Sequence, residues 1–276
     1  MQALNLPMPP FELASRVGCL EGAPDPTAMY EEIGSSSKEH LLAALPEGYS
    51  IEGRKLLDFG CGAGRTLRHF VAEAGGAELW GCDIDRTSIE WLEENMSPPL
   101  HVFTNAEVPP LGQPDGKFDL IFCVSVFTHL TRHWSEWLLE MHRLLAPGGL
   151  LLATYMGRGF SEEIGGEEWD EDRVGMMVLA PGQSWEKGGP MVFHSPWWLR
   201  AHWGRAFEIL SLTEAGFAGP DPDWGQGLVV MRRRDVQLTP ADLRAPSDDP
   251  REALALDHNL DRLMGELETL RAQPPA

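Results

Sequence analysis

The sequence predicts an α/β fold in which mostly parallel strands alternate with helices around one sheet. Apolar runs at residues 55–60, 78–83 and 100–105 are each followed by a segment with helical or irregular patterning. These runs are apolar on successive residues rather than on every second one, which is typical of strands buried on both faces. Strands that alternate with helices pair in parallel, because the helix carries the chain back across the sheet.

The alternation continues along the chain in a regular order. A helix over 64–75, closed by Gly75 and Gly76, follows the first strand, and a second helix over 87–96 has Thr87 or Ser88 as its N-cap. Further elements are expected as a strand over 118–126, a helix from 133 that is stopped by Pro147 and the glycines after it, a strand over 150–156, a helix over 196–206 and strands over 207–215 and 225–234. The last two strands have no helix between them, so we expect an antiparallel pair at the sheet edge.

Four segments outside this alternation predict an N-terminal cap, an insertion, a linker and a C-terminal helix. Residues 1–50 are rich in Pro and Gly and predict an N-terminal helical cap with short helices at 11–17 and 38–45, before a main domain over 51–235. Residues 157–193 interrupt the domain, and 236–252 form a linker. A further helix is expected over 253–272. Its leucines recur at alternating intervals of four and three residues: Leu256, Leu260, Leu263, Leu267 and Leu270. This stripe either packs on its own domain or joins two copies in a coiled coil, which allows a homodimer.

Composition narrows the class of protein. The formal net charge of −20 opposes the phosphate-neutralising surface of nucleic-acid binders and also binding to anionic membranes. The four cysteines show neither a C-x-x-C pair nor zinc spacing, so we expect free thiols and no metal site. The N-terminus lacks a basic region followed by an apolar run, and no segment is long and apolar enough to span a bilayer. We therefore expect a cytoplasmic protein.

The glycine-rich turn "GCGAG" at 60–64 is the first candidate site. It lies between a strand and a helix, where glycine allows positive φ and close approach of a ligand to the backbone. A phosphate-binding P-loop needs Gly-Lys-Ser/Thr, and the dinucleotide fingerprint needs G-x-G-x-x-G; the turn has neither. A nucleoside without phosphates is the remaining candidate, held by the backbone and by the helix N-terminus.

Polar residues after the next strands favour the same ligand. Asp83 ends the second strand nineteen residues after Gly64, where a carboxylate accepts hydrogen bonds from two ribose hydroxyls. Asn105 and the Ala106 amide end the third strand and suit an adenine edge. Asp58 lies within the first strand, where a charge needs a partner such as an amino-acid ammonium.

Taken together, "LLDFGCGAGRTL", "LWGCDID", "FDLIFCVSVFTHL" and "LLAPGGLLLAT" resemble a class I S-adenosylmethionine-dependent methyltransferase of bacterial small-molecule type over residues 50–235. The resemblance implies a Rossmann-like seven-stranded sheet of order 3-2-1-4-5-7-6, with strand 7 antiparallel, an insertion after strand 5 and a C-terminal helix. It implies S-adenosylmethionine as cofactor and S-adenosylhomocysteine as product. The residues expected around the cofactor are Tyr30, Asp58, Gly60, Cys61, Gly62, Gly64, Asp83, Ile84, Asn105, Ala106, Val124 and Ser125.

The expected reaction is methyl transfer to a small polar acceptor, most simply O-methylation in glycan or secondary-metabolite biosynthesis. A hydroxyl acceptor benefits from a general base, and His129 and His194 are the catalytic candidates, each with a structural role as the alternative. The insertion at 157–193, rich in carboxylates and Trp, is expected to shape the acceptor side as a lid or to be a solvated loop. N-methylation of an amine or protein side chain remains open, as does a non-catalytic cofactor-binding protein whose C-terminal helix contacts a partner.

Overall fold

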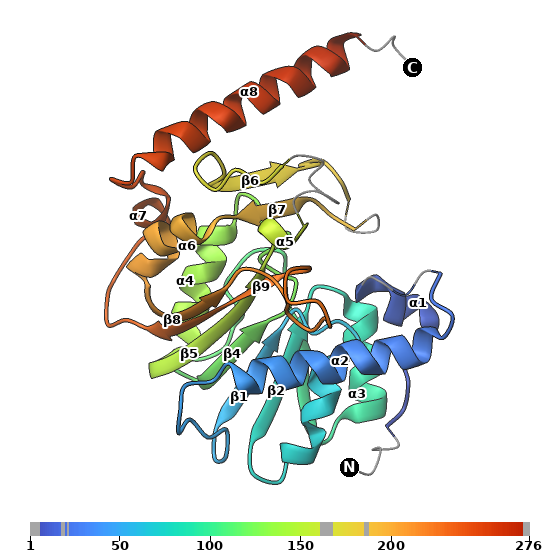
Figure 1. Ribbon diagram of the computed structural model, residues 1–276. Helices are drawn as coiled ribbons and strands as arrows, with labels where there is room; N and C mark the ends of the chain where they lie inside the picture. The colour runs from blue at the N-terminus through green and yellow to red at the C-terminus, as the bar shows by residue number, and fades with distance from the viewer. Residues whose placement is uncertain (1–5, 18–19, 21, 161–167, 185–187, 273–276) are drawn as a thin grey trace.

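A mixed β-sheet forms the centre of the protein (Figure 1). The computed structural model describes residues 6–17, 20, 22–160, 168–184 and 188–272. Within these residues the sheet has seven strands in the order β3-β2-β1-β4-β5-β9-β8. The strands are β1 (Lys55–Phe59), β2 (Glu78–Asp83), β3 (Leu100–Thr104), β4 (Phe118–Cys123), β5 (Leu145–Tyr155), β8 (Phe207–Thr213) and β9 (Gly227–Arg233). All pairs are parallel except those of β9, which runs antiparallel to β5 and β8. The predicted fold, sheet order and antiparallel edge are confirmed.

Successive residues of each central strand point to opposite faces, and both faces are buried. Leu56 packs in one apolar layer with helices α2 (Pro26–Ala43) and α3 (Arg86–Met96) and the 3₁₀ helix η2 (Leu67–Glu73). Leu57 packs in the opposite layer with α4 (Trp134–Leu144), α6 (Pro196–His202) and η5 (Trp203–Arg205). Each fully buried leucine stabilises the fold by roughly 2 kcal/mol. Burial on both faces explains why these strands read as continuous apolar runs.

The segment after the glycine turn is a 3₁₀ helix over 67–73 and not the expected helix over 64–75. Lys38 on α2 provides a physical reason, because its ammonium group donates to the His69 carbonyl at 2.8 Å and pairs with Glu73 at 2.6 Å. In an α-helix the His69 carbonyl would accept from the amide of residue 73. Because α2 packs here, the His69 carbonyl bonds to Lys38 instead of to a backbone amide of an α-helix.

Two helix starts differ from the predictions. Helix α3 is capped by Asp85 rather than by Thr87 or Ser88: its carboxylate accepts from the Thr87 amide at 3.2 Å and the Ser88 hydroxyl at 2.5 Å. Helix α2 begins at Pro26, capped by Asp25, and so is much longer than the predicted helix over 38–45. The predicted helix over 11–17 is present as α1 (Phe11–Ala14) followed by η1 (Ser15–Val17). The N-terminal segment thus packs as a long helix against the glycine turn.

The insertion after β5 contains structure that the sequence pattern did not predict. After the short helix α5 (Arg158–Phe160), strands β6 (Met176–Leu179) and β7 (Met191–His194) form an antiparallel two-stranded sheet. The Val192 amide donates to the Thr128 carbonyl at 2.7 Å, and the His194 amide donates to the Met156 carbonyl at 2.8 Å. These bonds hold β7 against the segments that follow β4 and β5. Residues 161–167 and 185–187 of the predicted insertion lie outside the described residues.

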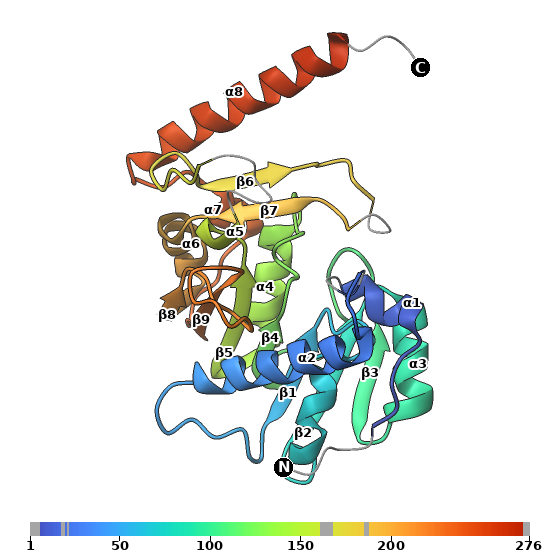
Figure 2. The same ribbon diagram turned by 45° about the vertical axis from the view of Figure 1, so that its right-hand side comes forward.

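Among the described residues, two helices follow the last strand of the sheet. The expected linker over 236–252 contains α7 (Pro240–Arg244), which starts with a capping box between Thr239 and Asp242. The final helix α8 (Arg251–Ala272) begins two residues before the predicted start and lies across the insertion, with its far end projecting from the rest of the chain (Figures 1 and 2). No helix within the described ranges is long and apolar enough to cross a membrane.

Candidate functional site

The glycine turn lies between the end of β1 and η2. Gly60, Gly62 and Gly64 all have left-handed φ angles, of 83°, 51° and 82°. The Gly60 amide donates to the Cys82 carbonyl at 2.8 Å, which ties the turn to β2. A Cβ atom on Gly60 would overlap the Val126 side chain, and one on Gly64 would lie 2.8 Å from Leu92 Cδ2. Gly60 and Gly64 are therefore required by close packing and by their backbone conformation, whether or not they also contact a ligand.

Asp83 joins the end of β2 to this turn. Its Oδ2 accepts from the Gly62 amide at 2.7 Å, and its Oδ1 accepts from the Asp85 amide at 2.8 Å. Burial raises the pKa of Asp83, while the backbone N–H bonds oppose that shift. A carboxylate offers about four lone-pair sites, so Asp83 keeps capacity to accept further hydrogen bonds from a ligand.

Asp58 is a second carboxylate beneath the turn, with only 2% of its surface exposed. Burial and the nearby charge of Asp83 raise its pKa well above the ordinary value, and Arg65 and the Leu67 amide lower it. Two neighbouring carboxylates create a strongly electronegative position. A ligand that carries an ammonium group would stabilise both.

The end of β3 provides polar and apolar surface next to Asp83. The Asn105 amide donates to the Asp83 carbonyl at 3.0 Å, and its side-chain Nδ2 donates to the Ala106 carbonyl at 2.8 Å. The side-chain Oδ1 of Asn105 is buried and has no hydrogen-bond partner among the described residues. Ile84, the residue after Asp83, exposes 38% of its surface. A buried acceptor and an exposed apolar side chain suit the edge and face of an aromatic base.

Tyr30 contacts the turn and Cys61 is part of it, and both side chains are buried. The hydroxyl of Tyr30 on α2 donates to the Ala63 carbonyl at 3.1 Å, and its side chain is fully buried. Tyr30 thus braces the turn from the N-terminal segment. Burial raises the pKa of the Cys61 thiol well above its usual value, so the thiol stays neutral. Cys82 and Cys123 are also free and buried, whereas Cys19 lies outside the described residues.

The end of β4 is built with help from distant segments. Val124 is half-buried, and Ser125 adopts a left-handed φ of 59°, which is strained for a residue with a Cβ. The Ser125 amide donates to Thr154 Oγ1 at 2.8 Å, and Gln226 Nε2 donates to Ser125 Oγ at 2.6 Å. Sequence reasoning missed Thr154 and Gln226, because their only link to Ser125 is the pairing of β4, β5 and β9.

The two candidate histidines lie in different surroundings. His129 Nδ1 is 2.7 Å from the Pro190 carbonyl oxygen, and since a carbonyl only accepts, Nδ1 carries the proton. Burial lowers the pKa of His129, so its ring is neutral near pH 7 with the lone pair on Nε2. His194 is fully buried against the rings of Trp198 and Trp203, with neither nitrogen hydrogen-bonded within the described part of the chain. Burial lowers the pKa of His194 to about 3.

The predicted cofactor residues converge at one edge of the sheet. Apart from Tyr30, they lie in β1 or at the carboxyl ends of β1 to β4, next to the point between β1 and β4 where the strand order reverses. Ligands of open α/β sheets bind at such a point. Among the described residues, no group of three or more His, Cys, Asp or Glu side chains is placed to hold a metal ion.

Comparison with known proteins identifies relatives of the segment that contains most of this edge. Residues 57–151 match the family model described as a methyltransferase domain. This segment is similar to a methyltransferase domain, and the strand order of the sheet is the one expected for a class I S-adenosylmethionine-dependent methyltransferase. The cofactor of this domain is S-adenosylmethionine, and the residues fit it. Asp83 has acceptor capacity for the ribose, Asn105 Oδ1 has no hydrogen-bond partner among the described residues, and Asp58 suits an ammonium group.

Individual relatives support the methyltransferase domain over part of their length. The chain is 30% identical over 125 residues to phthiotriol/phenolphthiotriol dimycocerosates methyltransferase 1 of Mycobacterium ulcerans, covering 45% of this chain and 44% of that protein. It is 30% identical over 144 residues to a ubiquinone biosynthesis O-methyltransferase of Cereibacter sphaeroides, covering 50% and 56%. The chain thus spans about half the length of these relatives.

A solved structure supports the fold beyond the matched segment. An S-adenosylmethionine-dependent methyltransferase from Mesorhizobium loti superposes with a TM-score of 0.54 at 19% identity, covering 73% of this chain and all of that one. The methyltransferase fold therefore extends over most of the chain.

Proposed function

We propose that this protein transfers the methyl group of S-adenosylmethionine to an oxygen atom of a small polar molecule. The observation that carries the proposal is the placement of His129, with Nδ1 bonded to the Pro190 carbonyl and its pKa lowered by burial, just after the β4 end of the cofactor edge. A neutral imidazole with its lone pair on Nε2 is the form that accepts a proton from a hydroxyl group.

The cofactor supplies an electrophilic methyl group on a sulfonium sulfur, so the protein needs to position the acceptor and remove its proton. Asp83, Asn105 and Asp58 hold the nucleoside and amino-acid ends. His129 Nε2 would accept the proton of the acceptor hydroxyl, while S-adenosylmethionine held by these residues would supply the methyl group. Of the two candidate bases His129 suits this role better, because a histidine with a pKa near 3 is a weak base.

The insertion is proposed to form the acceptor side of the site. Its strand β7 bonds to the segments after β4 and β5, and Pro190 in the same insertion orients His129. Its acidic residues include Glu168, Asp170 and Glu171, and Glu171 accepts from Trp169 Nε1 at 3.0 Å. A small acceptor rather than a nucleic acid is favoured by the net charge of −20.

Calorimetric titration with S-adenosylhomocysteine, followed by a methyl-transfer screen against hydroxyl and amine acceptors, tests the proposal. We expect binding at one site per chain and turnover with a hydroxyl compound. Turnover with amines alone would replace O-methylation by N-methylation. Binding without turnover on any acceptor would favour a non-catalytic cofactor-binding protein, and no binding would overturn the proposal.

A further inference from the structure

The final helix presents an uncovered apolar stripe. Leu256, Leu260, Leu263 and Leu267 expose 52%, 57%, 48% and 51% of their surface. They follow one another at intervals of four, three and four residues, which places them on one line along the helix. Met264 beside them is 59% exposed. A continuous row of exposed leucines on a charged protein indicates an interaction surface.

The rest of the chain covers a different side of the same helix. Asn259 Nδ2 donates to the Met176 carbonyl at 3.0 Å, Ala255 is 5% exposed, and the Arg262 side chain is 15% exposed and paired with Glu266 at 3.2 Å. With about 100° of rotation per residue, the leucine stripe lies roughly a quarter turn from this docked side. The prediction that the stripe packs on its own domain is therefore wrong.

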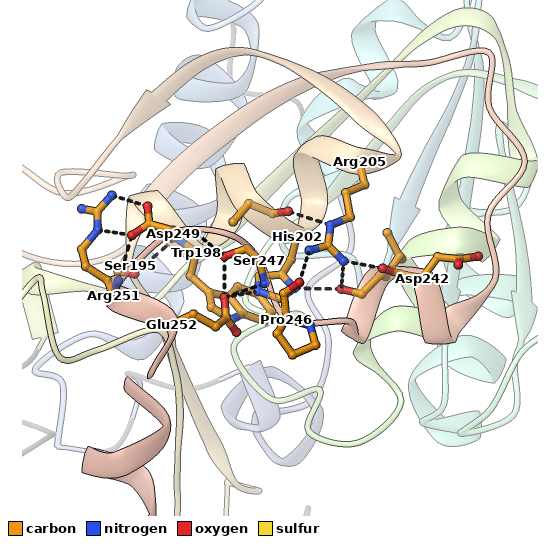
Figure 3. Close-up of polar contacts among 12 residues, drawn as sticks. Ser195, Trp198, His202, Arg205, Asp242, Pro246, Ser247, Asp249, Arg251 and Glu252 are labelled. Atoms are coloured by element: carbon orange, nitrogen blue, oxygen red, sulfur yellow. Dashed lines mark hydrogen bonds and ion pairs between the residues drawn. The ribbon is translucent and has the colours of Figure 1, made fainter. Parts of the chain in front are cut away.

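The base of α8 is held firmly, so the stripe keeps its direction. His202 on α6 lies between the Leu243 carbonyl, 2.8 Å from Nδ1, and the Glu252 carboxylate, 3.1 Å from Nε2. Figure 3 shows His202 and Glu252 close together. Arg251 pairs with Asp249 at 2.7 Å in the same cluster. These contacts at the first turn tie the helix to the main domain.

We propose that α8 pairs with α8 of a second copy of this chain, in antiparallel orientation, through the leucine stripe. In heptad terms the leucines occupy positions a and d, with Asp257, Met264 and Arg271 on one flank (e) and Glu252, Asn259 and Glu266 on the other (g). The g flank is engaged by the chain's own contacts through Glu252 and Asn259. A second helix must therefore approach from the e flank.

Charge on the flanks selects the orientation. In an antiparallel pair the two e flanks face each other, so the acidic Asp257 of one copy lies on the side of the basic Arg271 of the other. In a parallel pair Asp257 would face Glu252 of the second copy, which is repulsive. An antiparallel pair also places the two main domains toward opposite ends of the coil. This separation matters because each chain carries a formal charge of −20.

Sedimentation of the full chain tests the association. We expect a dimer, and we expect Leu260→Glu/Leu263→Glu to be monomeric with unchanged circular dichroism and unchanged S-adenosylhomocysteine binding. Leu254→Glu is the matched control, since Leu254 is 49% exposed on another side of α8. A monomeric wild type, a larger assembly, or dissociation by Leu254→Glu to the same extent would overturn the proposal, independently of whether the protein transfers methyl groups.

Two charge reversals test the orientation. Asp257→Arg and Arg271→Asp should each weaken self-association, on the order of tenfold for two repulsive pairs per dimer. An equimolar mixture of the two variants should restore wild-type association, because each chain then offers the charge that the other lacks. In a parallel pair Asp257→Arg would instead strengthen self-association, and that result would overturn the antiparallel arrangement.

Discussion

The two halves of the sheet's carboxyl edge are constructed differently. At β1 to β3 a single carboxylate bonds to backbone amides: Asp83 accepts from Gly62, 21 residues earlier, and from Asp85, two residues later. At β4 and β5 they join distant segments, as when Pro190 bonds to His129 and Gln226 bonds to Ser125. The contacts of the first half join residues at most 21 apart in the chain, whereas those of the second half join residues 61 and 101 apart. We expect the first half to control cofactor binding and the second to control rate.

The largest effect is expected from a change at His129, which should lower kcat without changing cofactor affinity. His129→Ala should lower kcat by roughly 10²- to 10⁴-fold, the usual contribution of a general base, and leave the Kd for S-adenosylhomocysteine unchanged. In the wild type, kcat should fall as the pH drops through the lowered pKa of His129, below its ordinary value of 6.5, because the protonated ring cannot accept a proton. The pH profile of His129→Ala should lack this limb. An unchanged kcat would assign His129 a structural role.

The next effect concerns the cofactor side. Asp83→Ala should weaken binding of S-adenosylhomocysteine by roughly 100-fold or more, since hydrogen bonds to a charged group contribute about 1.5–3 kcal/mol each. Calorimetry on this variant measures the loss. Glu90→Gln, which removes only an exposed ion pair with Arg86, is the control and should bind normally. Equal binding by Asp83→Ala and the wild type would contradict the assigned cofactor edge.

Asp58→Asn should stabilise the unliganded protein by about 1–3 kcal/mol at pH 7, because a buried carboxylate beside Asp83 is costly to ionise. The folded-state pKa of Asp58 is raised, so its favourable contribution is present at low pH and is lost as the pH rises through that pKa. The difference in Tm between the variant and the wild type should therefore shrink as the pH is lowered. The same variant should bind the cofactor more weakly. Unchanged Tm and binding would argue against an electronegative position that serves a ligand.

The smallest effect is expected at His194. Since neither ring nitrogen has a hydrogen-bond partner in the described residues, His194→Phe should change stability by less than about 2 kcal/mol and leave kcat unchanged. Thermal unfolding and steady-state kinetics measure both. A large loss of kcat with wild-type stability would transfer the role of base from His129 to His194.

Local patterns in the chain were enough to predict the sheet and to place the proposed cofactor residues at one edge of it. Strand β1 with its glycine turn, Asp83 and Asn105 were all identified from apolar runs and the residues that end them, because parallel strands of a βαβ unit bring their carboxyl ends to one edge. The direction of β9 and the order of the strands were implied by the family resemblance and are confirmed.

Contacts between distant segments decided the rest. Lys38 on α2 donates a hydrogen bond to the His69 carbonyl in η2, the helix that follows β1. The residues around position 69 give no sign of this contact, so the sequence pattern could not predict its effect on the helix. The pairing of Gln226 with Ser125 spans strands that become neighbours only in the folded sheet. The heptad of α8 was visible in the chain, but whether its leucines were covered depended on which side of the helix met β6. The spacing of apolar residues in a sequence shows that a helix has an apolar face, but only the tertiary packing determines whether that face is covered and by which element.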